Sequence, residues 1–258
     1  MANRRGLSLG EVLIVVAIVA ILVGMLLPAT RRVREPAARA VCQNNLKQLM
    51  QALESYESTE HRPPYSQGYP AGCFGAGASP EERLSWMVAL LPHLEQELAA
   101  QRVDPTTGYA GNVETLRTIL KPFKCPSGSE MPADPITHYV AMAGLGTDAA
   151  SRPAGAPGNG FMGYDRITKM NMIVDGTANT IAILETRTDL GPWARGGRST
   201  LRGFDPAAVG DLPFGGHKYA FHAAMADGSV REVRTNVRRE ALAAAITIAG
   251  NESPSDFE

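Results

Sequence analysis

Residues 7–27 form an apolar run that holds one ionisable side chain, Glu11. As an α-helix, about 21 residues would extend roughly 30 Å, which is the thickness of the hydrocarbon core of a bilayer. Arg4 and Arg5 precede the run, and positive residues favour the cytoplasmic side. We therefore expect a transmembrane helix over residues 7–28. It would anchor a single-pass protein in the cytoplasmic (inner) membrane, with the N-terminus in the cytoplasm and the head outside it.

The residues at the start of this run form the sequence Gly6-Leu7-Ser8-Leu9-Gly10-Glu11. It resembles the prepilin-type cleavage and methylation site of type IV pilins and type II secretion pseudopilins. The resemblance implies that residues 1–6 are a leader, that a prepilin peptidase cuts between Gly6 and Leu7, and that Leu7 becomes the methylated N-terminus. It also implies an assembly role for Glu11, which would meet the amino terminus of a neighbouring subunit. An ordinary signal anchor and a cleaved secretory signal have the same basic start and apolar run. A secretory signal would have a shorter core without an acidic residue, so the signal anchor is the main alternative.

The next stretch of the chain has the pattern of an amphipathic helix. Apolar residues recur at three- and four-residue intervals from residue 41 to 56, namely at Cys42, Leu46, Leu49, Met50, Leu53 and Tyr56. We expect the N-terminal helix to continue over residues 29–60, with kinks at Pro28 and Pro36, and to end before Pro63-Pro64.

A globular head is expected over residues 61–250, followed by a polar, disordered tail at 251–258. The 26 glycines and 18 prolines predict many loops, and the small-residue segment 144–163 is expected not to pack. Ser79-Pro80-Glu81-Glu82 predicts a capped helix start. We place that helix's inner face at Leu84, Val88, Leu91, Leu94 and Leu98, with a division at Pro92.

Strands are predicted in the second half of the head at residues 138–143 and 181–184. A hairpin is predicted from segments 219–226 and 229–233, joined at Asp227-Gly228, where both residues would take positive φ. A last helix is expected to begin at an Asn236 cap. The fold class is therefore α+β and pilin-like: a long N-terminal helix, transmembrane and then amphipathic, packed on a loop-rich head with an antiparallel sheet.

The charge balance and the cysteines restrict the partners and the environment. The net charge is −1, and loss of Arg4 and Arg5 with the leader gives −1 − 2 = −3, which does not suggest a nucleic-acid surface.

Three cysteines, Cys42, Cys73 and Cys125, would meet an oxidising compartment if the head is exported. Three thiols allow three single bridges. We favour a Cys42–Cys125 disulfide because each of the two lies beside a predicted core segment.

Several motifs along the head resemble a second family. His217 is followed by nine residues and then Asp227-Gly228, and with the pilin-like start this H-x9-DG element resembles the pilin-related DUF1559 family. The other similar stretches are Cys42-Gln43-Asn44-Asn45-Leu46-Lys47-Gln48, Leu84-Ser85-Trp86, Leu91-Pro92-His93-Leu94-Glu95-Gln96, Lys124-Cys125-Pro126-Ser127 and Asp175-Gly176-Thr177-Ala178-Asn179-Thr180. The biochemical role of that family is not established.

Four residues are weak candidates for metal ligands: Asp175, Asn179, His217 and Asp227. Asp175 and Asn179 suggest calcium because major pseudopilins hold calcium in loops of the head, although the spacing is not that of an EF-hand. A turn stabilised by their own hydrogen bonds is the simpler interpretation.

His217, His222 and Asp227 suggest a metal or acid–base site. Strand alternation, however, places Phe221, Ala223 and Met225 on one face and His222 on the other. We favour structural roles for the three residues, and we expect neither an enzyme nor a resident cofactor.

The sequence therefore favours a membrane-anchored, pseudopilin-like subunit of a type II secretion or type IV filament-type assembly. Its partners would be the prepilin peptidase, other pilin-like subunits and the membrane, and its role would be structural. The alternative is a membrane-tethered extracytoplasmic module that binds a solute or a polysaccharide. An exported hydrolase that uses His217 and Asp227 is the least favoured interpretation.

Overall fold

The computed structural model describes residues 9–59, 68–118, 120–127 and 135–250. The predicted leader with Gly6 and Leu7, the Pro63-Pro64 stop and the tail at 251–258 lie outside these residues. The chain divides into two units, Met1–Ala40 and Val41–Glu258. Each unit is described separately.

The first unit contains the beginning of helix α1, which extends over Leu9–Glu57 and continues through Pro28 and Pro36. Large apolar side chains are exposed along its start, at Leu9, Val12, Leu13, Ile14, Val15, Val16, Ile18, Val19 and Ile21. Near the end of the unit, Arg39 Nε lies 3.6 Å from Glu35 Oε1, one helical turn away. Among the helices that the structure describes, none combines the length and the apolar character needed to cross a membrane.

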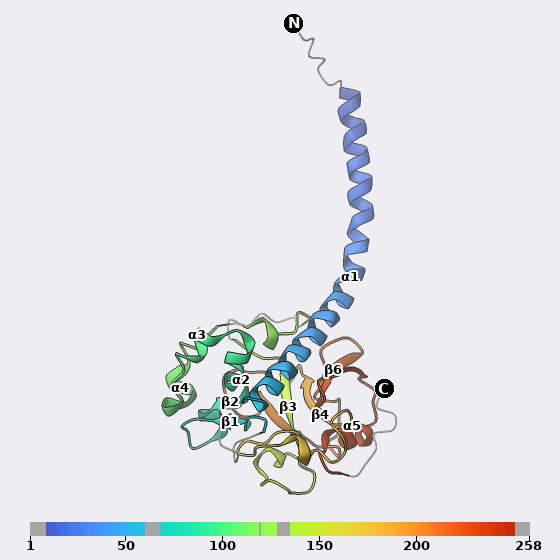
Figure 1. Ribbon diagram of the computed structural model, residues 1–258. Helices are drawn as coiled ribbons and strands as arrows, with labels where there is room; N and C mark the ends of the chain where they lie inside the picture. The colour runs from blue at the N-terminus through green and yellow to red at the C-terminus, as the bar shows by residue number, and fades with distance from the viewer. Residues whose placement is uncertain (1–8, 60–67, 119, 128–134, 251–258) are drawn as a thin grey trace. The chain divides into compact units, whose positions relative to one another are not determined.

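The second unit is built on the last part of α1 and a five-stranded sheet within the described residues (Figure 1). The predicted apolar stripe of the helix is confirmed as core: Leu46, Leu49, Met50 and Leu53 are fully buried. They belong to one cluster with Tyr139 of the sheet. The helix ends at Glu57, three residues before the predicted boundary.

The sheet has the strand order β5-β3-β4-β6-β7. Its strands are β3 (Tyr139–Leu145), β4 (Ile181–Glu185), β5 (Leu201–Phe204), β6 (Ala220–Met225) and β7 (Val230–Arg234). The predicted antiparallel pairing is found for β3–β4, β4–β6 and β6–β7, whereas β3 and β5 run parallel. The sheet is therefore mixed, and the protein is an α+β protein.

The two faces of the sheet carry separate apolar clusters because side chains alternate along each strand. On β3, Tyr139, Ala141 and Ala143 join the cluster that includes α1. Val140 and Met142 point to the other face and join a cluster with helix α5 (Arg239–Ile246). The helix α5 follows Arg238 rather than the predicted Asn236 cap.

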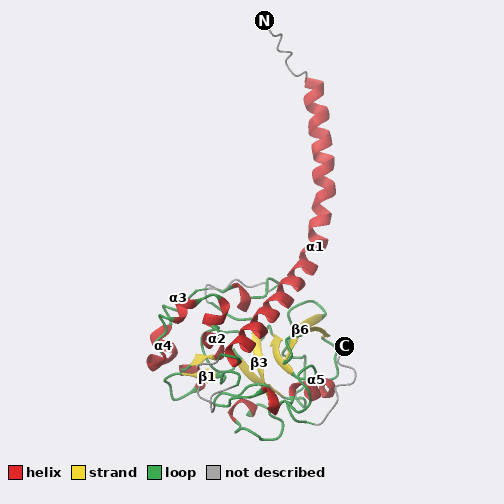
Figure 2. Ribbon diagram, in the orientation of Figure 1, coloured by secondary structure: helices red, strands yellow, loops and turns green. Residues whose placement is uncertain are grey.

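Short elements and loops complete the unit (Figure 2). Strands β1 (Cys73–Phe74) and β2 (Leu84–Ser85) pair with each other. The short α-helices are α2 (Trp86–Ala89), α3 (Glu97–Ala100) and α4 (Gly108–Asn112). Single 3-10 turns form η2 (Pro80–Glu82), η3 (Leu91–Leu94), η4 (Pro105–Thr107), η5 (Lys121–Phe123), η6 (Ala149–Ser151) and η7 (Met170–Met172).

The helix predicted after Ser79 is wrong in extent, although its start is confirmed. Glu82 closes a capping box with Ser79, but the chain forms only the turn η2 there. After η3 the backbone takes a left-handed conformation at Glu95, with φ 60°. Leu98 beyond that point is 73% exposed, so it is not part of an inner face. Glu95 therefore ends the turn η3, and only the short helix α3 follows it.

The predicted hairpin is confirmed, with a different turn. Gly228 N donates to Met225 O at 3.0 Å, and Met225 N donates to Ser229 O at 2.8 Å. Gly228 has φ 82°, whereas Asp227 keeps a negative φ. This is the three-residue loop in which one left-handed residue follows a type I turn, so only the glycine needs the special conformation. The Asp227 carboxylate accepts from the backbone N–H and the hydroxyl of Ser229.

The small-residue segment 144–163 packs, contrary to the prediction. Phe161 and Met162 are fully buried, and the guanidinium of Arg166 is surrounded by the backbone of the segment. It donates to the carbonyl oxygens of Ala143, Ala149, Arg152, Gly160 and Met162 and to Oδ1 of Asn159. Burial lowers the pKa of Arg166 to about 10, and the nearby Arg152 charge adds to this effect. One buried side chain therefore satisfies carbonyl groups that a loop normally directs to water.

Arg166→Met should destabilise the full-length chain by about 3 kcal/mol, because several buried carbonyl groups would lose their donor. Urea denaturation followed by circular dichroism measures this change. Arg198→Met is the matched control because the Arg198 side chain is 58% exposed in a surface pair with Asp189, and it should change stability by less than about 0.5 kcal/mol. Equal losses in the two variants would contradict the role assigned to Arg166.

Candidate functional site

A buried polar cluster lies where α1 packs on the sheet. It contains Cys42, Cys125, Glu185 and His217. One donor atom from each of these four residues lies within 4.8 Å of the others, and all four residues are buried. Two sulfur atoms, an imidazole nitrogen and a carboxylate oxygen therefore lie close together in one buried space.

Four separate segments position these side chains. Cys42 is on α1 and Glu185 is the last residue of β4. Cys125 follows the turn η5, and His217 precedes β6, where its backbone N–H donates to Ala220 O at 3.0 Å. The Cα atom of Glu185 is paired with that of Tyr139 on β3, so both side chains lie on the sheet face that α1 covers.

The Glu185 carboxylate uses one oxygen for protein contacts. Oε2 accepts from the backbone N–H of His222 at 2.7 Å and lies 2.9 Å from Nδ1 of the same residue. Oε1 has no hydrogen-bond partner among the described residues and lies 3.7 Å from Nε2 of His217. Burial alone would raise the pKa of Glu185, but the contacts with His217 and His222 outweigh it and hold the pKa well below its usual range. These contacts therefore favour the charged form of the carboxylate.

The two thiols are coupled to each other. All three cysteines, Cys42, Cys73 and Cys125, are free thiols in the described structure. A hydrogen bond from Cys42 to Cys125 raises the pKa of Cys42, to which burial and the Glu185 charge add. The same bond lowers the pKa of Cys125 to about 6, against the effect of burial. Cys125 is therefore the sulfur with thiolate character.

The imidazole rings of His217 and His222 meet edge to face, with centroids 5.1 Å apart. Nδ1 of His217 lies 3.2 Å from the Ser127 hydroxyl, which leaves Nε2 directed at Glu185. Nε2 of His222 lies 3.7 Å from Oε2 of Glu232. Each ring is therefore held between two contacts. The ring of His217 lies between Ser127 and Glu185, and the ring of His222 lies between Glu185 and Glu232.

Asn45 and His138 form hydrogen bonds next to the cluster and hold the segment that carries Cys125. Nδ2 of Asn45 donates to Lys124 O at 2.9 Å and to the Tyr139 hydroxyl at 3.1 Å, so it connects α1 to the segment that carries Cys125. Burial raises the pKa of Tyr139 well above its usual value. Burial, with the charge of Lys124, lowers the pKa of His138 to about 4. Neutral His138 then accepts from the Cys125 backbone N–H at 3.4 Å.

The structure separates the four residues that the sequence suggests as metal ligands. His217 alone is in the buried cluster. Asp227 is exposed in the hairpin turn, at the other end of the six-residue strand β6. Asp175 Oδ2 accepts from Gly250 N at 2.6 Å and from the Thr247 hydroxyl. Asn179 Nδ2 donates to Asp175 O at 3.1 Å, which gives that pair a structural role in a turn.

The predicted processing and assembly residues belong to the first unit. Gly6 and Leu7 lie outside the described residues, and Glu11 is exposed in the first turn of α1.

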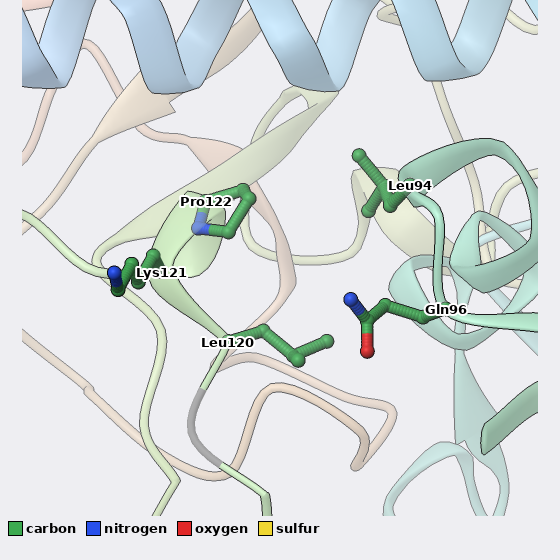
Figure 3. A pocket seen from close by; sticks show the side chains of 5 residues that line it. All are labelled: Leu94, Gln96, Leu120, Lys121 and Pro122. Carbon is green, nitrogen blue, oxygen red and sulfur yellow. The ribbon is translucent and has the colours of Figure 1, made fainter. Parts of the chain in front are cut away.

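A small pocket lies elsewhere on the second unit (Figure 3). It has a volume of about 280 Å³ and is lined by Leu94, Gln96, Leu120, Lys121 and Pro122. Gln96 and Leu120 face each other across it (Figure 3). This volume is slightly below the range for small-molecule sites, which begins at roughly 300 Å³. The side chains named as its lining offer one cation and one amide, and they include no nucleophile or acid–base pair.

The fold and the cluster define an α+β protein with a mixed sheet and a buried Cys/His/Glu site. A model of the family described as protein of unknown function (DUF1559) matches residues 31–212. Since the match covers well over half of the chain, the protein belongs to the DUF1559 family. Neither a curated protein nor a solved structure matches the chain. The matched range includes Cys42, Cys125 and Glu185, and it ends before the H-x9-DG element.

The sequence singles out three members of this cluster but not Glu185. It favours a disulfide between Cys42 and Cys125 and makes His217 a weak candidate for a metal ligand, without bringing the three residues together. No local spacing reveals the site because its members are 83, 60 and 32 residues apart, by subtraction of positions 42, 125, 185 and 217. The sequence does hold one signal for Glu185: it is a charged residue directly after the apolar strand 181–184. Burial of a charge at such a position is costly unless the charge is paired.

Asn45→Ala should destabilise the full-length chain by about 2 kcal/mol, because Lys124 O and the Tyr139 hydroxyl would lose a buried donor. Asn44→Ala is the matched control, since the neighbouring Asn44 is exposed. Chemical denaturation of both variants measures the difference. A control that loses as much stability as Asn45→Ala would show that the helix, rather than this amide, is responsible.

Proposed function

We propose that this protein is a pseudopilin-like subunit of a filament-type assembly in the cytoplasmic membrane, related to type II secretion and type IV pilin systems. The first part of α1 would be the anchor and the assembly element. The residues from Val41 onward would form the head outside the membrane. The role is structural rather than catalytic.

The exposed apolar start of α1 carries the proposal. Val12 to Val16 are five consecutive apolar residues, and each of these side chains is at least 45% exposed. Five residues cover more than one turn of about 3.6 residues, so this part of the helix has no polar face. A helix that is apolar on all sides is typical of a membrane environment or of the interior of a helix bundle. Both surroundings exist in a pilin-like filament.

The position of Glu11 supports the same assignment. It lies in the first turn of α1, among apolar residues, where a carboxylate would be costly in lipid without a positive partner. After cleavage between Gly6 and Leu7, the new amino terminus of a neighbouring subunit would supply that positive charge. The proposed mechanism is therefore assembly through a Glu11–amine contact between subunits.

A membrane-tethered binding module is the second candidate. It would use the same anchor and would bind a solute or polysaccharide through the head, without a subunit interface along α1. The pocket next to Pro122 is the observation that favours it, and its size limits the ligand to a small group. The two functions differ in whether a prepilin peptidase processes the chain.

The N-terminal peptide of the protein from its native membrane should begin at N-methylated Leu7. Mass spectrometry of the intact chain and of its N-terminal peptide measures this directly. A chain that still begins at Met1 or Ala2 would exclude prepilin processing and would favour the tethered binding module.

Glu11→Ala should abolish co-sedimentation and cross-linking of subunits while leaving the thermal unfolding of the head unchanged. The reason is that the amino terminus of the neighbour would lose its counter-charge in an apolar environment. Glu114→Ala is the control because the Glu114 side chain is 84% exposed on the head. Wild-type yields of assembled Glu11→Ala subunits would remove the proposed role of Glu11.

A further inference from the structure

We propose that Cys42, Cys125, Glu185 and His217 form a structural zinc site in the head. The cluster offers two sulfurs, one imidazole nitrogen and one carboxylate oxygen, a donor set that binds zinc in proteins. The four residues are buried and are all protein ligands. A closed tetrahedral site of this kind is structural rather than catalytic.

The distance between Glu185 and His217 fits two ligands of one ion. Oε1 and Nε2 are 3.7 Å apart, which is longer than a hydrogen bond of about 2.7–3.2 Å. Tetrahedral zinc with oxygen and nitrogen bonds of about 2.0–2.2 Å separates such atoms by roughly 3.4 Å. All the donor atoms of the cluster lie within 4.8 Å of one another. Two sulfur atoms bound to one tetrahedral zinc ion would be roughly 3.8 Å apart. Shifts of about half an ångström for each donor would complete the tetrahedron.

The carboxylate is already oriented as a metal ligand. Its side chain is fully buried, and Oε1 has no hydrogen-bond partner among the described residues. Oε2 is held by the backbone N–H and the ring of His222. A buried acceptor atom without a donor costs about 1–3 kcal/mol, and a metal ion directed at Oε1 removes that cost.

The surroundings of the other ligands agree with this assignment. Nδ1 of His217 lies 3.2 Å from the Ser127 hydroxyl, the outer contact that fixes the ring of a zinc-bound histidine. The two sulfurs and the carboxylate are potential anions in one buried space, and a divalent cation would compensate their mutual repulsion. A Cys42–Cys125 disulfide would use the sulfurs but would leave Oε1 of Glu185 unsatisfied.

The site would join four distant segments of the head. Its ligands come from α1, the segment after η5, the end of β4 and the loop before β6. Zinc binding would therefore stabilise the contact between α1 and the sheet. This inference is independent of filament assembly, since it concerns the second unit alone.

The test uses the full-length chain purified in detergent, with its zinc content measured by plasma mass spectrometry after dialysis against metal-free buffer. We expect one zinc ion per chain. Replacement by Co²⁺ should give the visible bands of tetrahedral cobalt and a near-ultraviolet sulfur-to-cobalt charge-transfer band. Added Zn²⁺ should raise the thermal unfolding temperature of the metal-free protein, because the ion binds the folded state more tightly than the unfolded chain.

Cys42→Ser and Cys125→Ser should lower the zinc affinity by a factor of about 100 or more, since loss of an outer contact alone costs about 10–100-fold. Glu185→Gln should weaken the binding and change the cobalt spectrum while keeping the size of the side chain. Cys73→Ser is the matched control because Cys73 is also a buried free cysteine and lies outside the cluster. It should retain zinc and the cobalt spectrum.

The isolated protein also decides between zinc and a disulfide. A peptide in which Cys42 and Cys125 are cross-linked would overturn the proposal, whatever the reduced chain binds. A reduced wild-type chain that shows no sulfur-to-cobalt band would overturn it as well, and this result does not depend on the folding of any variant. An equal loss of zinc in Cys73→Ser would exclude the assigned ligand set.

Discussion

The packing of one helical stripe on one sheet face is the interaction on which the head depends. Leu46, Leu49, Met50 and Leu53 are fully buried in the same cluster as Tyr139. Each buried side chain of this size contributes about 1.5–3 kcal/mol. The helical turns that bury them also bring Cys42 and Asn45 to the end of β4. The apolar packing therefore fixes the position of the polar cluster, because both lie on the same side of α1.

Glu185 shows how the fold keeps a charge in this interior. A carboxylate without compensation would cost several kcal/mol there, and the backbone N–H of His222 supplies the first compensation. That donor is available because β4 and β6 are adjacent in the sheet. The order of the strands thus places a hydrogen-bond donor next to the Glu185 carboxylate. The carboxylate in turn contacts the rings of His217 and His222 and orients them. The cluster consequently depends on long-range strand pairing rather than on any local motif.

The difference between local signals and long-range pairing also decides which parts of the fold can be predicted. The stripe on α1 has a period of 3.6 residues, strand β4 is an apolar run, and the β6–β7 hairpin has a glycine turn. The sequence predicts these three elements well because each signal is local. The packed segment 144–163 was missed because its order depends on Arg166, a residue outside it. The parallel β3–β5 pair and the convergence of Cys42, Cys125, Glu185 and His217 have no local signal. They arise only when distant segments pair.

Helix α1 has two kinds of surface, and this difference connects the fold to the proposed assembly. From Val41 to Glu57 it has one buried stripe and exposed polar positions such as Lys47 and Gln51, and the sheet supplies the covering it needs. From Leu9 to Ile21 its apolar side chains are exposed on every side. The hydrophobic effect makes that exposure unfavourable in water, at about 25 cal/mol for each Å² of apolar surface. Since the described residues leave this surface exposed, the covering proposed here comes from lipid and from the helices of neighbouring subunits.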